Sequence, residues 1–263
     1  MAKRLRLDAE LVRRGLVSSR SLARSAVEEG KVLVGGLPAT KIDALVSPDM
    51  AIALAGPPAR YVSRGGDKLA GAIERLDVAV AGKAWLDAGA STGGFTDCLL
   101  QNGATRVLAV DVGYGQFDWG LRNDERVTVI ERMNVRNLTS TDLPFVADGV
   151  TADLSFISLR TVLDSLVASA SEKADFILLV KPQFEVGRSA VGKGGVVREP
   201  EKWESALTGV VDRGTELGLG LLGAIPSPLR GPAGNVEFFV QLRRGPSVAD
   251  DGAIAAAVQE VGS

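Results

Sequence analysis

The stretch WLDAGASTGGFTDCLLQNGATRVLAVD, residues 85–111, predicts a strand, a glycine-rich turn, a helix and a second strand that ends on an acid. Gly89, Gly93 and Gly94 allow a tight turn, and the free N–H groups at the start of the helix point into it. Asp111 ends the second strand, where a carboxylate can bind ribose hydroxyls. The stretch therefore indicates a site for a nucleoside cofactor.

The spacing of the glycines distinguishes between cofactors. Dinucleotide sites favour G-x-G-x-x-G, whereas this chain has Asp87-x-Gly89-x-x-x-Gly93-Gly94. An acid before the turn suits a cation better than a pyrophosphate, so S-adenosylmethionine, with its ammonium and sulfonium groups, fits best. A dinucleotide site, or a turn without a ligand, is the alternative. The expected cofactor contacts are Asp87, Ala88, Gly89, Ser91, Thr92, Gly93, Gly94 and Phe95 around the methionine end, Asp111 at the ribose, Val112, Met133 and Asn134 at the adenine, and Asp153 near the sulfonium.

Two further motifs predict chemistry that the rest of the chain argues against. Residues 89–93 match the G-x-S-x-G nucleophile elbow, but that mechanism needs an imidazole base and the chain has no histidine. Residues 187–194 approach the phosphate-binding loop of nucleotide hydrolases, but Gly194 follows Lys193 where that loop needs a hydroxyl for magnesium. We interpret the second motif as a mobile loop on the substrate side.

Composition limits the class of protein. With 46% hydrophobic and 24% charged residues, the chain of 263 residues is typical of a globular protein of one or two domains. No apolar run reaches the roughly 20 residues of a membrane span, and the N-terminus lacks the apolar core of a signal peptide. One cysteine, Cys98, and no histidine argue against structural zinc or haem. We expect a cytoplasmic monomer that binds neither membrane nor metal.

The N-terminal part predicts a small basic α+β domain. Residues 1–68 carry 12 Lys and Arg against 7 Asp and Glu, a net charge of +5, whereas the remainder carries −7. This asymmetry suggests a polyanionic partner, with docking of the basic helices on protein as the alternative. We expect helices over 9–14 and 21–29, the second capped by Ser18 or Ser19, and strands at 31–34 and 50–54. The candidate contacts are Arg4, Arg6, Arg13, Arg14, Arg20, Arg24 and Lys31.

From residue 83 strands and helices alternate, which predicts a doubly wound α/β sheet. The expected strands lie at 84–88, 107–111, 127–131, 150–153, 176–180, 221–225 and 236–242, with helices at 94–101, 159–169 and 201–217 and a hairpin at 226–234. Pro57 and Pro58 mark a boundary because proline breaks strands and helices. We expect domains over 1–58 and 63–245, a linker over 59–62, and an appended tail over 246–263.

Reactive side chains fall where open α/β sheets bind ligands, at the carboxyl ends of strands. Asp153 ends the fourth expected strand and Lys181 the fifth, Glu237 opens the last, and Lys68 precedes the first. The alternative for these four residues is an ordinary ion-pair network on the surface.

Motifs in both halves resemble known families. Leu5-x-Leu7-Asp8, Gly30-Lys31-Val32 and neighbouring residues resemble the S-four-type RNA-binding domain over about 5–62. The motifs D-A-G-A-S-T-G-G-F-T, A-D-L-S-F-I-S, V-K-P-Q-F-E and G-N-V-E-F-F resemble the FtsJ-like RNA 2′-O-methyltransferases, and the chain to about 244 resembles the TlyA, or hemolysin A, family. The resemblance implies a Rossmann-like class I methyltransferase domain, dependent on S-adenosylmethionine, that methylates cytidine ribose in small- and large-subunit rRNA. A membrane-lytic protein and a non-catalytic rRNA-binding assembly factor are the alternatives.

The same resemblance implies a catalytic tetrad of Lys68, Asp153, Lys181 and Glu237. A ribose hydroxyl is a weak acid, so its proton must leave as the O–C bond forms, and a lysine with an ordinary pKa of about 10.4 can accept it only when that pKa falls. We expect Lys181 as the base, the two carboxylates as orienting groups, and Lys68 as a positioning or tuning group. Arg64, with Lys193 and Arg198, is expected to contact RNA.

Overall fold

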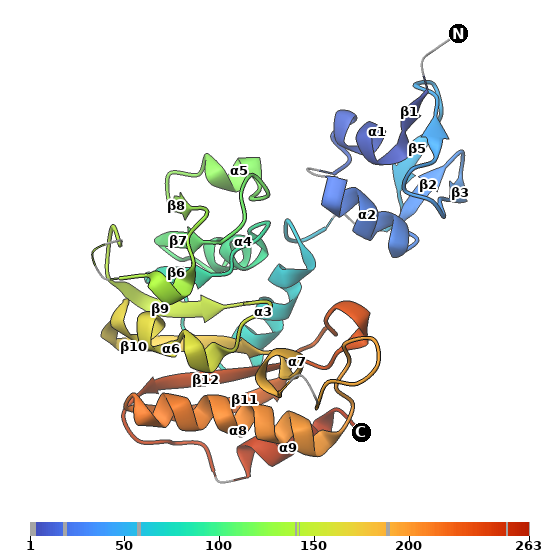
Figure 1. Ribbon diagram of the computed structural model, residues 1–263. Helices are drawn as coiled ribbons and strands as arrows, with labels where there is room; N and C mark the ends of the chain where they lie inside the picture. The colour runs from blue at the N-terminus through green and yellow to red at the C-terminus, as the bar shows by residue number, and fades with distance from the viewer. Residues whose placement is uncertain are drawn as a thin grey trace. The chain divides into compact units, whose positions relative to one another are not determined.

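The computed structural model describes residues 4–17, 20–56, 59–139, 141, 143–187, 190–250 and 252–262. The chain divides into two compact units, Met1–Arg60 and Tyr61–Ser263 (Figure 1). Several residues with a predicted place lie outside the described residues: Ser18 and Ser19 at the helix cap, Pro57 and Pro58 in the connector, and Arg188 and Ser189 in the second glycine motif.

The N-terminal unit combines two helices with two small antiparallel sheets. Its helices pack through a core that includes Leu7, Leu11, Ala23, Val27 and Val32, all buried. Both predicted helices and both predicted strands are confirmed, the two strands pair with each other, and three short strands were not predicted. The elements are β1 (Leu5–Arg6), α1 (Leu7–Arg13), α2 (Arg20–Glu28), β2 (Val32–Val34), β3 (Leu37–Pro38), β4 (Leu45–Val46) and β5 (Ile52–Leu54).

A seven-stranded sheet in the order β11-β12-β10-β9-β6-β7-β8 forms the centre of the C-terminal unit. The five strands from β8 to β10 run parallel, and β12 runs antiparallel to both of its neighbours. The reversal matters because the start of β12 then lies at the same edge as the carboxyl ends of the parallel strands. The strands are β6 (Ala84–Ala88), β7 (Arg106–Val110), β8 (Val127–Ile130), β9 (Ala147–Ala152), β10 (Ala170–Val180), β11 (Leu219–Pro226) and β12 (Phe238–Arg244).

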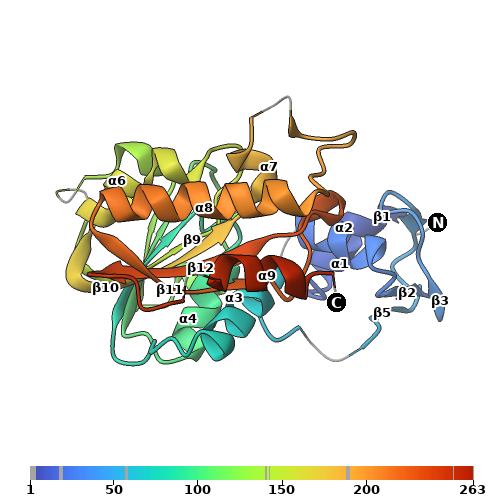
Figure 2. The same cartoon turned by 90° about the horizontal axis from the view of Figure 1, so that it is seen from below.

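Helices cover both faces of this sheet, with α3 and α4 on one side and α6 and α8 on the other (Figure 2). Alternate strand residues supply the two cores: Trp85 and Phe239 pack toward α3 and α4, whereas Leu86 and Phe238 pack toward α6 and α8. The predicted doubly wound α/β class is confirmed. The helices are α3 (Arg64–Arg75), α4 (Gly94–Gln101), α5 (Trp119–Arg122), α6 (Leu163–Ala168), α7 (Pro182–Glu185), α8 (Pro200–Glu216) and α9 (Ala253–Glu260).

Differences from the predicted elements lie mainly at their ends and in three helices that were not predicted. The helix predicted over 159–169 is a 3-10 turn, η3 (Leu159–Thr161), followed by α6. Helices α3, α5 and α7 were not predicted. The tail contains α9, whose Ala257 and Val258 are buried in the core shared with α8, so this helix belongs to the fold rather than to an appendage.

Val258→Asp is expected to destabilise the C-terminal unit by about 3 kcal/mol, because it places an unpaired carboxylate in an apolar core. Urea unfolding followed by tryptophan fluorescence measures the change. Ala256→Asp adds the same charge to the same helix at an exposed position and should cost less than about 1 kcal/mol. Equal losses of unfolding free energy in the two variants would show that α9 contributes nothing to the core.

Candidate active site

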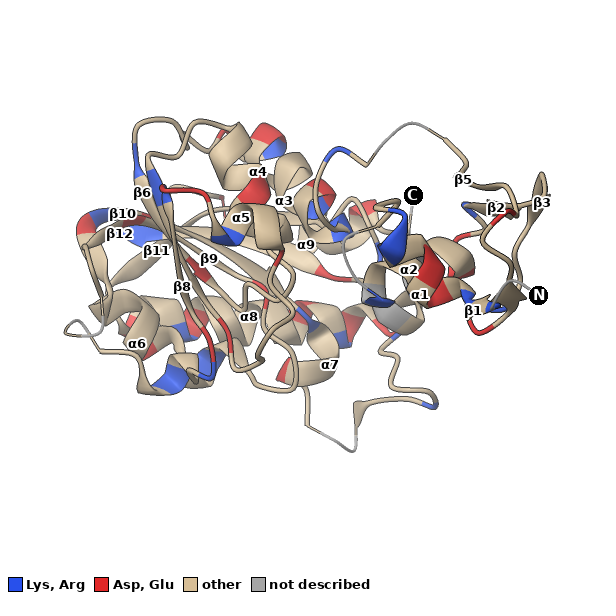
Figure 3. Cartoon of the chain, turned by 90° about the horizontal axis from the view of Figure 1, so that it is seen from above, with Lys and Arg blue, Asp and Glu red and all other residues tan. Residues whose placement is uncertain are grey.

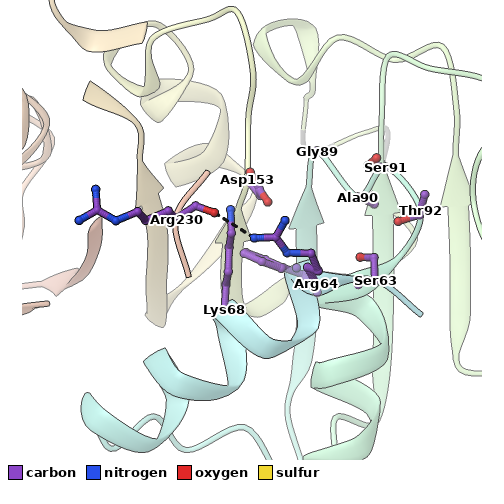
Figure 4. A pocket seen from close by; sticks show the side chains of 12 residues that line it. Ser63, Arg64, Lys68, Gly89, Ala90, Ser91, Thr92, Asp153 and Arg230 are labelled. Atoms are coloured by element: carbon purple, nitrogen blue, oxygen red, sulfur yellow. Dashed lines mark hydrogen bonds between the residues drawn. The ribbon is translucent and has the colours of Figure 1, made fainter. Parts of the chain in front are cut away.

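Two ion pairs stand at the sheet edge where the parallel strands end and β12 begins. Lys68, on α3, bonds through Nζ to Oε2 of Glu237 at 2.5 Å. Lys181 Nζ lies 2.5 Å from Oδ1 of Asp153. Lys68 and Asp153 line the same pocket, and Figure 4 shows the lysine side chain extending toward the carboxylate. The structure thus brings together the four residues of the predicted tetrad, as two pairs.

Of the two ion pairs, Lys68–Glu237 is the more deeply buried, so each of its charges depends more strongly on its partner. The side chains are 9% and 0% exposed, and a charge removed from water is destabilising unless a partner compensates it. The pair connects α3 to the residue immediately before β12. It therefore fixes two segments that are 169 positions apart in the sequence.

Lys181 is held by two oxygen atoms that follow the end of β9. Its ammonium contacts the Asp153 carboxylate and donates to the Ser155 hydroxyl at 3.1 Å. The carboxylate of Asp153 is 23% exposed and Ser155 is exposed, so this pair opens toward solvent. Lys181 consequently sits between the interior of the sheet and a surface that a substrate can reach.

A pocket of about 200 Å³ lies beside these residues (Figure 4). The first residues of α3 and α4 line it, and helix N-termini favour negatively charged groups. Gly89 has φ +83°, and a Cβ there would come within 2.5 Å of the Asp153 carbonyl oxygen. The lining residues are Ser63, Arg64, Gly65, Lys68, Gly89, Ala90, Ser91, Thr92, Gly94, Phe95, Asp153 and Arg230.

The predicted cofactor residues fall into two groups. Gly89, Ser91, Thr92, Gly94, Phe95 and Asp153 line the pocket, whereas Asp87, Ala88, Gly93, Asp111, Val112, Met133 and Asn134 do not. The second group adjoins the first at Asp111, whose carboxylate accepts the Ser91 N–H at 2.8 Å and whose carbonyl accepts the Met133 N–H at 3.0 Å. Asn134 caps a 3-10 turn, η1 (Val135–Asn137), and Val112 is 66% exposed. Their roles in binding a cofactor stay predictions.

Asp87 is fully buried beneath the glycine turn. Its carboxylate accepts hydrogen bonds from the hydroxyls of Thr96, at 2.6 Å, and Thr151, at 3.3 Å. Burial raises the pKa of Asp87 to about 7, the Thr96 hydrogen bond opposes that rise, and the charge of Asp153 adds to it. Its contacts are with Thr96 on α4 and Thr151 on β9, and it does not line the pocket.

Sequence reasoning missed several residues around the pocket. Ser63, Gly65 and Arg230 line it, and the Arg230 carbonyl accepts a hydrogen bond from Arg64 at 3.2 Å. A serine directly before a helix is a known N-terminal signal, but the helix α3 itself was not predicted.

Phe156 is 92% exposed with φ +65°, and its ring lies 5.2 Å from that of Phe184. No sequence pattern indicated that an aromatic ring would stand in water there.

Acidic side chains form ion pairs with several basic residues of the N-terminal unit. Figure 3 marks the acidic and basic positions along its ribbon. Arg13 and Arg14 both bind the buried Glu10, and their hydrogen bonds lower its pKa to about 2. Arg14 also donates to three backbone carbonyls near β5, so its guanidinium stabilises the unit. Arg6 and Arg20 contact Asp8, Lys31 pairs with Glu29, and Arg4 and Arg24 are exposed. Contact of these residues with RNA stays a prediction.

Hydrogen bonds hold residues 192–197, which include the end of the second glycine motif. Gly192 donates to the Val196 carbonyl at 3.1 Å, and Asn235 both accepts from Val197 and donates to Gly195. Lys193 and Arg198 are exposed. Residues 192–197 are therefore held against the segment that precedes β12.

Comparisons with known proteins confirm the families predicted for both halves of the chain. Residues 61–244 match the FtsJ-like methyltransferase family and residues 5–52 match the S4 domain. A 16S/23S rRNA (cytidine-2′-O)-methyltransferase, TlyA of Mycobacterium tuberculosis, is 54% identical over 92% of this chain and 91% of its own. Hemolysin A of Brachyspira hyodysenteriae is 35% identical over 89% of this chain and 98% of its own. A solved structure described as a hemolysin, from Streptococcus thermophilus, superposes with a TM-score of 0.78 at 35% identity and covers 100% of this chain and 98% of its own.

Asp87→Asn is expected to change how stability depends on pH. The folded chain binds the Asp87 proton more tightly than the unfolded chain, so this stabilisation is complete below about pH 4 and is lost as the pH rises through about 7. Asparagine keeps a neutral group at all pH values. Relative to the unmodified chain, the variant should therefore gain roughly 2–3 kcal/mol of unfolding free energy between pH 5 and pH 8. A difference between the two chains that stays constant over this range, measured by urea unfolding, would contradict the assignment.

Proposed function

Because the chain belongs to the FtsJ-like methyltransferase family, we propose that it methylates the ribose 2′-hydroxyl of cytidine in small- or large-subunit ribosomal RNA, with S-adenosylmethionine as the methyl donor. The observation that carries the proposal is the meeting of two lysine–carboxylate pairs beside one pocket at the carboxyl edge of the sheet. A surface ion-pair network would not place Lys68 and Glu237 in the interior.

The charges around the pocket suit S-adenosylmethionine. The glycines of the turn are required by packing within the chain, because a side chain at Gly89 would collide with the Asp153 backbone and one at Gly94 with Ser63. The N-termini of α3 and α4 suit the carboxylate of the methionine end, and Asp153 suits its cationic groups. Asp111, linked to Ser91, would hold the ribose, and Val112, Met133 and Asn134 would surround the adenine. When bound, the donor supplies an electrophilic methyl group.

The four charged residues have different roles in the reaction of the ribose hydroxyl. With its ammonium deprotonated, Lys181 takes the hydroxyl proton on Nζ as the new O–C bond forms and the S–C bond of the donor breaks, and Asp153 and Ser155 orient the amine. Glu237 holds Lys68 at the wall of the pocket, where its ammonium positions the ribose. Correct placement of reacting groups can account for roughly 7–11 kcal/mol of barrier lowering, so the positions that these pairs give the two lysines contribute to the rate.

An exposed aromatic ring supports a nucleotide as the substrate. Phe156 follows Asp153 by three positions, and its ring packs beside that of Phe184, which follows Lys181 by three. Stacking of a base on an aromatic ring is worth about 1–3 kcal/mol. A base stacked on Phe156 would bring its ribose to the adjoining Lys181 and Asp153.

The properties of the N-terminal unit support an RNA polymer as the substrate. Its match to the S4 domain and its exposed basic residues, among them Arg4 and Arg24, suit phosphate contacts that supply affinity with little base reading. We place the protein in the cytoplasm, as a monomer acting on ribosomal subunits, and keep 1–58, 59–62 and 63–245 as proposed boundaries, with the tail 246–263 joined to the last domain through α9. In the part of the chain that the structure describes, no helix has the length and apolar character needed to cross a bilayer.

Lys181→Ala is expected to lower methyl transfer by about 10²–10⁴-fold, the usual contribution of a positioned base. The assay measures tritium transfer from labelled S-adenosylmethionine to ribosomal subunits from cells that lack the protein. Binding of S-adenosylhomocysteine, measured by calorimetry, should be unchanged. Lys173→Ala removes an exposed lysine from β10, the strand directly before Lys181, and should leave transfer unaltered. Substantial transfer by the Lys181 variant would remove this residue from the mechanism, and no transfer by the unmodified chain would favour an RNA-binding assembly factor.

A further inference from the structure

Glu237 has one carboxylate oxygen that the ion pair does not use. Oε2 binds Lys68, whereas Oε1 is buried and has no hydrogen-bond partner among the described residues. This second oxygen lies against Gly231, in the hairpin between β11 and β12. A Cβ built on Gly231 would overlap Oε1 and come within 2.6 Å of the carboxylate carbon. The carboxylate therefore occupies the space that any side chain at position 231 would need.

Hydrogen bonds hold the hairpin in its place beside the carboxylate. Gly231 is buried, its N–H donates to the Asn235 carbonyl at 2.9 Å, and its own carbonyl accepts from Gly234 at 3.1 Å. Asn235 is also buried, and its side chain is held by Val197 at 3.1 Å and by Gly195 at 3.0 Å. A collision at position 231 must consequently be relieved by the Glu237 side chain.

The backbone of Gly231 would accept another residue. Its φ lies outside the left-handed region, in contrast to Gly234 of the same hairpin at +83°. Alanine at 231 would therefore introduce no backbone strain, and its effect would come from the single added methyl group.

We propose that Gly231 is a positioning residue for methyl transfer, which acts by leaving room for the Glu237 carboxylate. The order of contacts runs from Gly231 to Glu237, from Glu237 to Lys68, and from Lys68 to the pocket. Displacing the carboxylate breaks or lengthens its bond to Lys68, so the ammonium leaves its place at the pocket wall. The inference rests on the proposed function for its catalytic part, and on the geometry of the hairpin for its structural part.

The first experiment compares Gly231→Ala with Gly252→Ala in the tritium-transfer assay on ribosomal subunits. Misplacement by about 1 Å can cost about 100-fold in rate, so kcat of the first variant should fall by about that factor while KM for the subunits changes little. Gly252 is exposed, and a Cβ there makes only an ordinary contact of 3.5 Å with Asp250, so its variant should keep full activity. Equal activity of the two variants would overturn the proposal.

The second experiment is a double-mutant cycle read by urea unfolding, which needs no RNA substrate. Gly231→Ala should lower the unfolding midpoint of the unmodified chain and of Glu237→Gln, because glutamine fills the same space. It should have little effect in Glu237→Ala, where the atoms that collide are gone. An equal loss in the Glu237→Ala background would overturn the assigned contact. If the cycle behaves as expected but the unmodified chain transfers no methyl group, the proposed function fails and the contact stands.

Discussion

The buried pair of Lys68 and Glu237 is the interaction on which the C-terminal unit and its site both depend. Neither charge is stable in the interior alone, so α3 and the start of β12 must meet for either to be tolerated. The consequence is that folding itself assembles half of the tetrad. The second pair, Lys181 with Asp153, stands nearer to solvent, where a substrate can approach it.

The direction of β12 makes this meeting possible. Had β12 run parallel to β10, the residue before it would lie at the opposite edge of the sheet, remote from Lys181. Because it runs antiparallel, with Phe238 opposite Val180, Glu237 adjoins the carboxyl ends of the parallel strands. The hairpin before β12 then supplies Arg230 to the pocket wall and the small residue Gly231 beside the carboxylate.

Much of the fold follows from local sequence, and much of the site does not. The segment from β6 to β7 was predicted closely because its apolar strands and glycine turn carry their own signals. Helix α3 was missed because its second and third residues, Gly65 and Gly66, have low helix propensity, and it is stabilised by the burial of Leu69 and Ala72. The tetrad residues were predicted from strand ends and resemblance. Their pairing was not, since it depends on side-chain packing between distant segments.

The central claim is that this arrangement methylates ribose in ribosomal RNA, and mapping 2′-O-methylation across both rRNAs tests it most directly. We expect one or more cytidines to carry the modification in cells that make the protein, to lose it when the gene is deleted, and to regain it when the gene is restored. Identical ribose methylation maps with and without the protein would contradict the account.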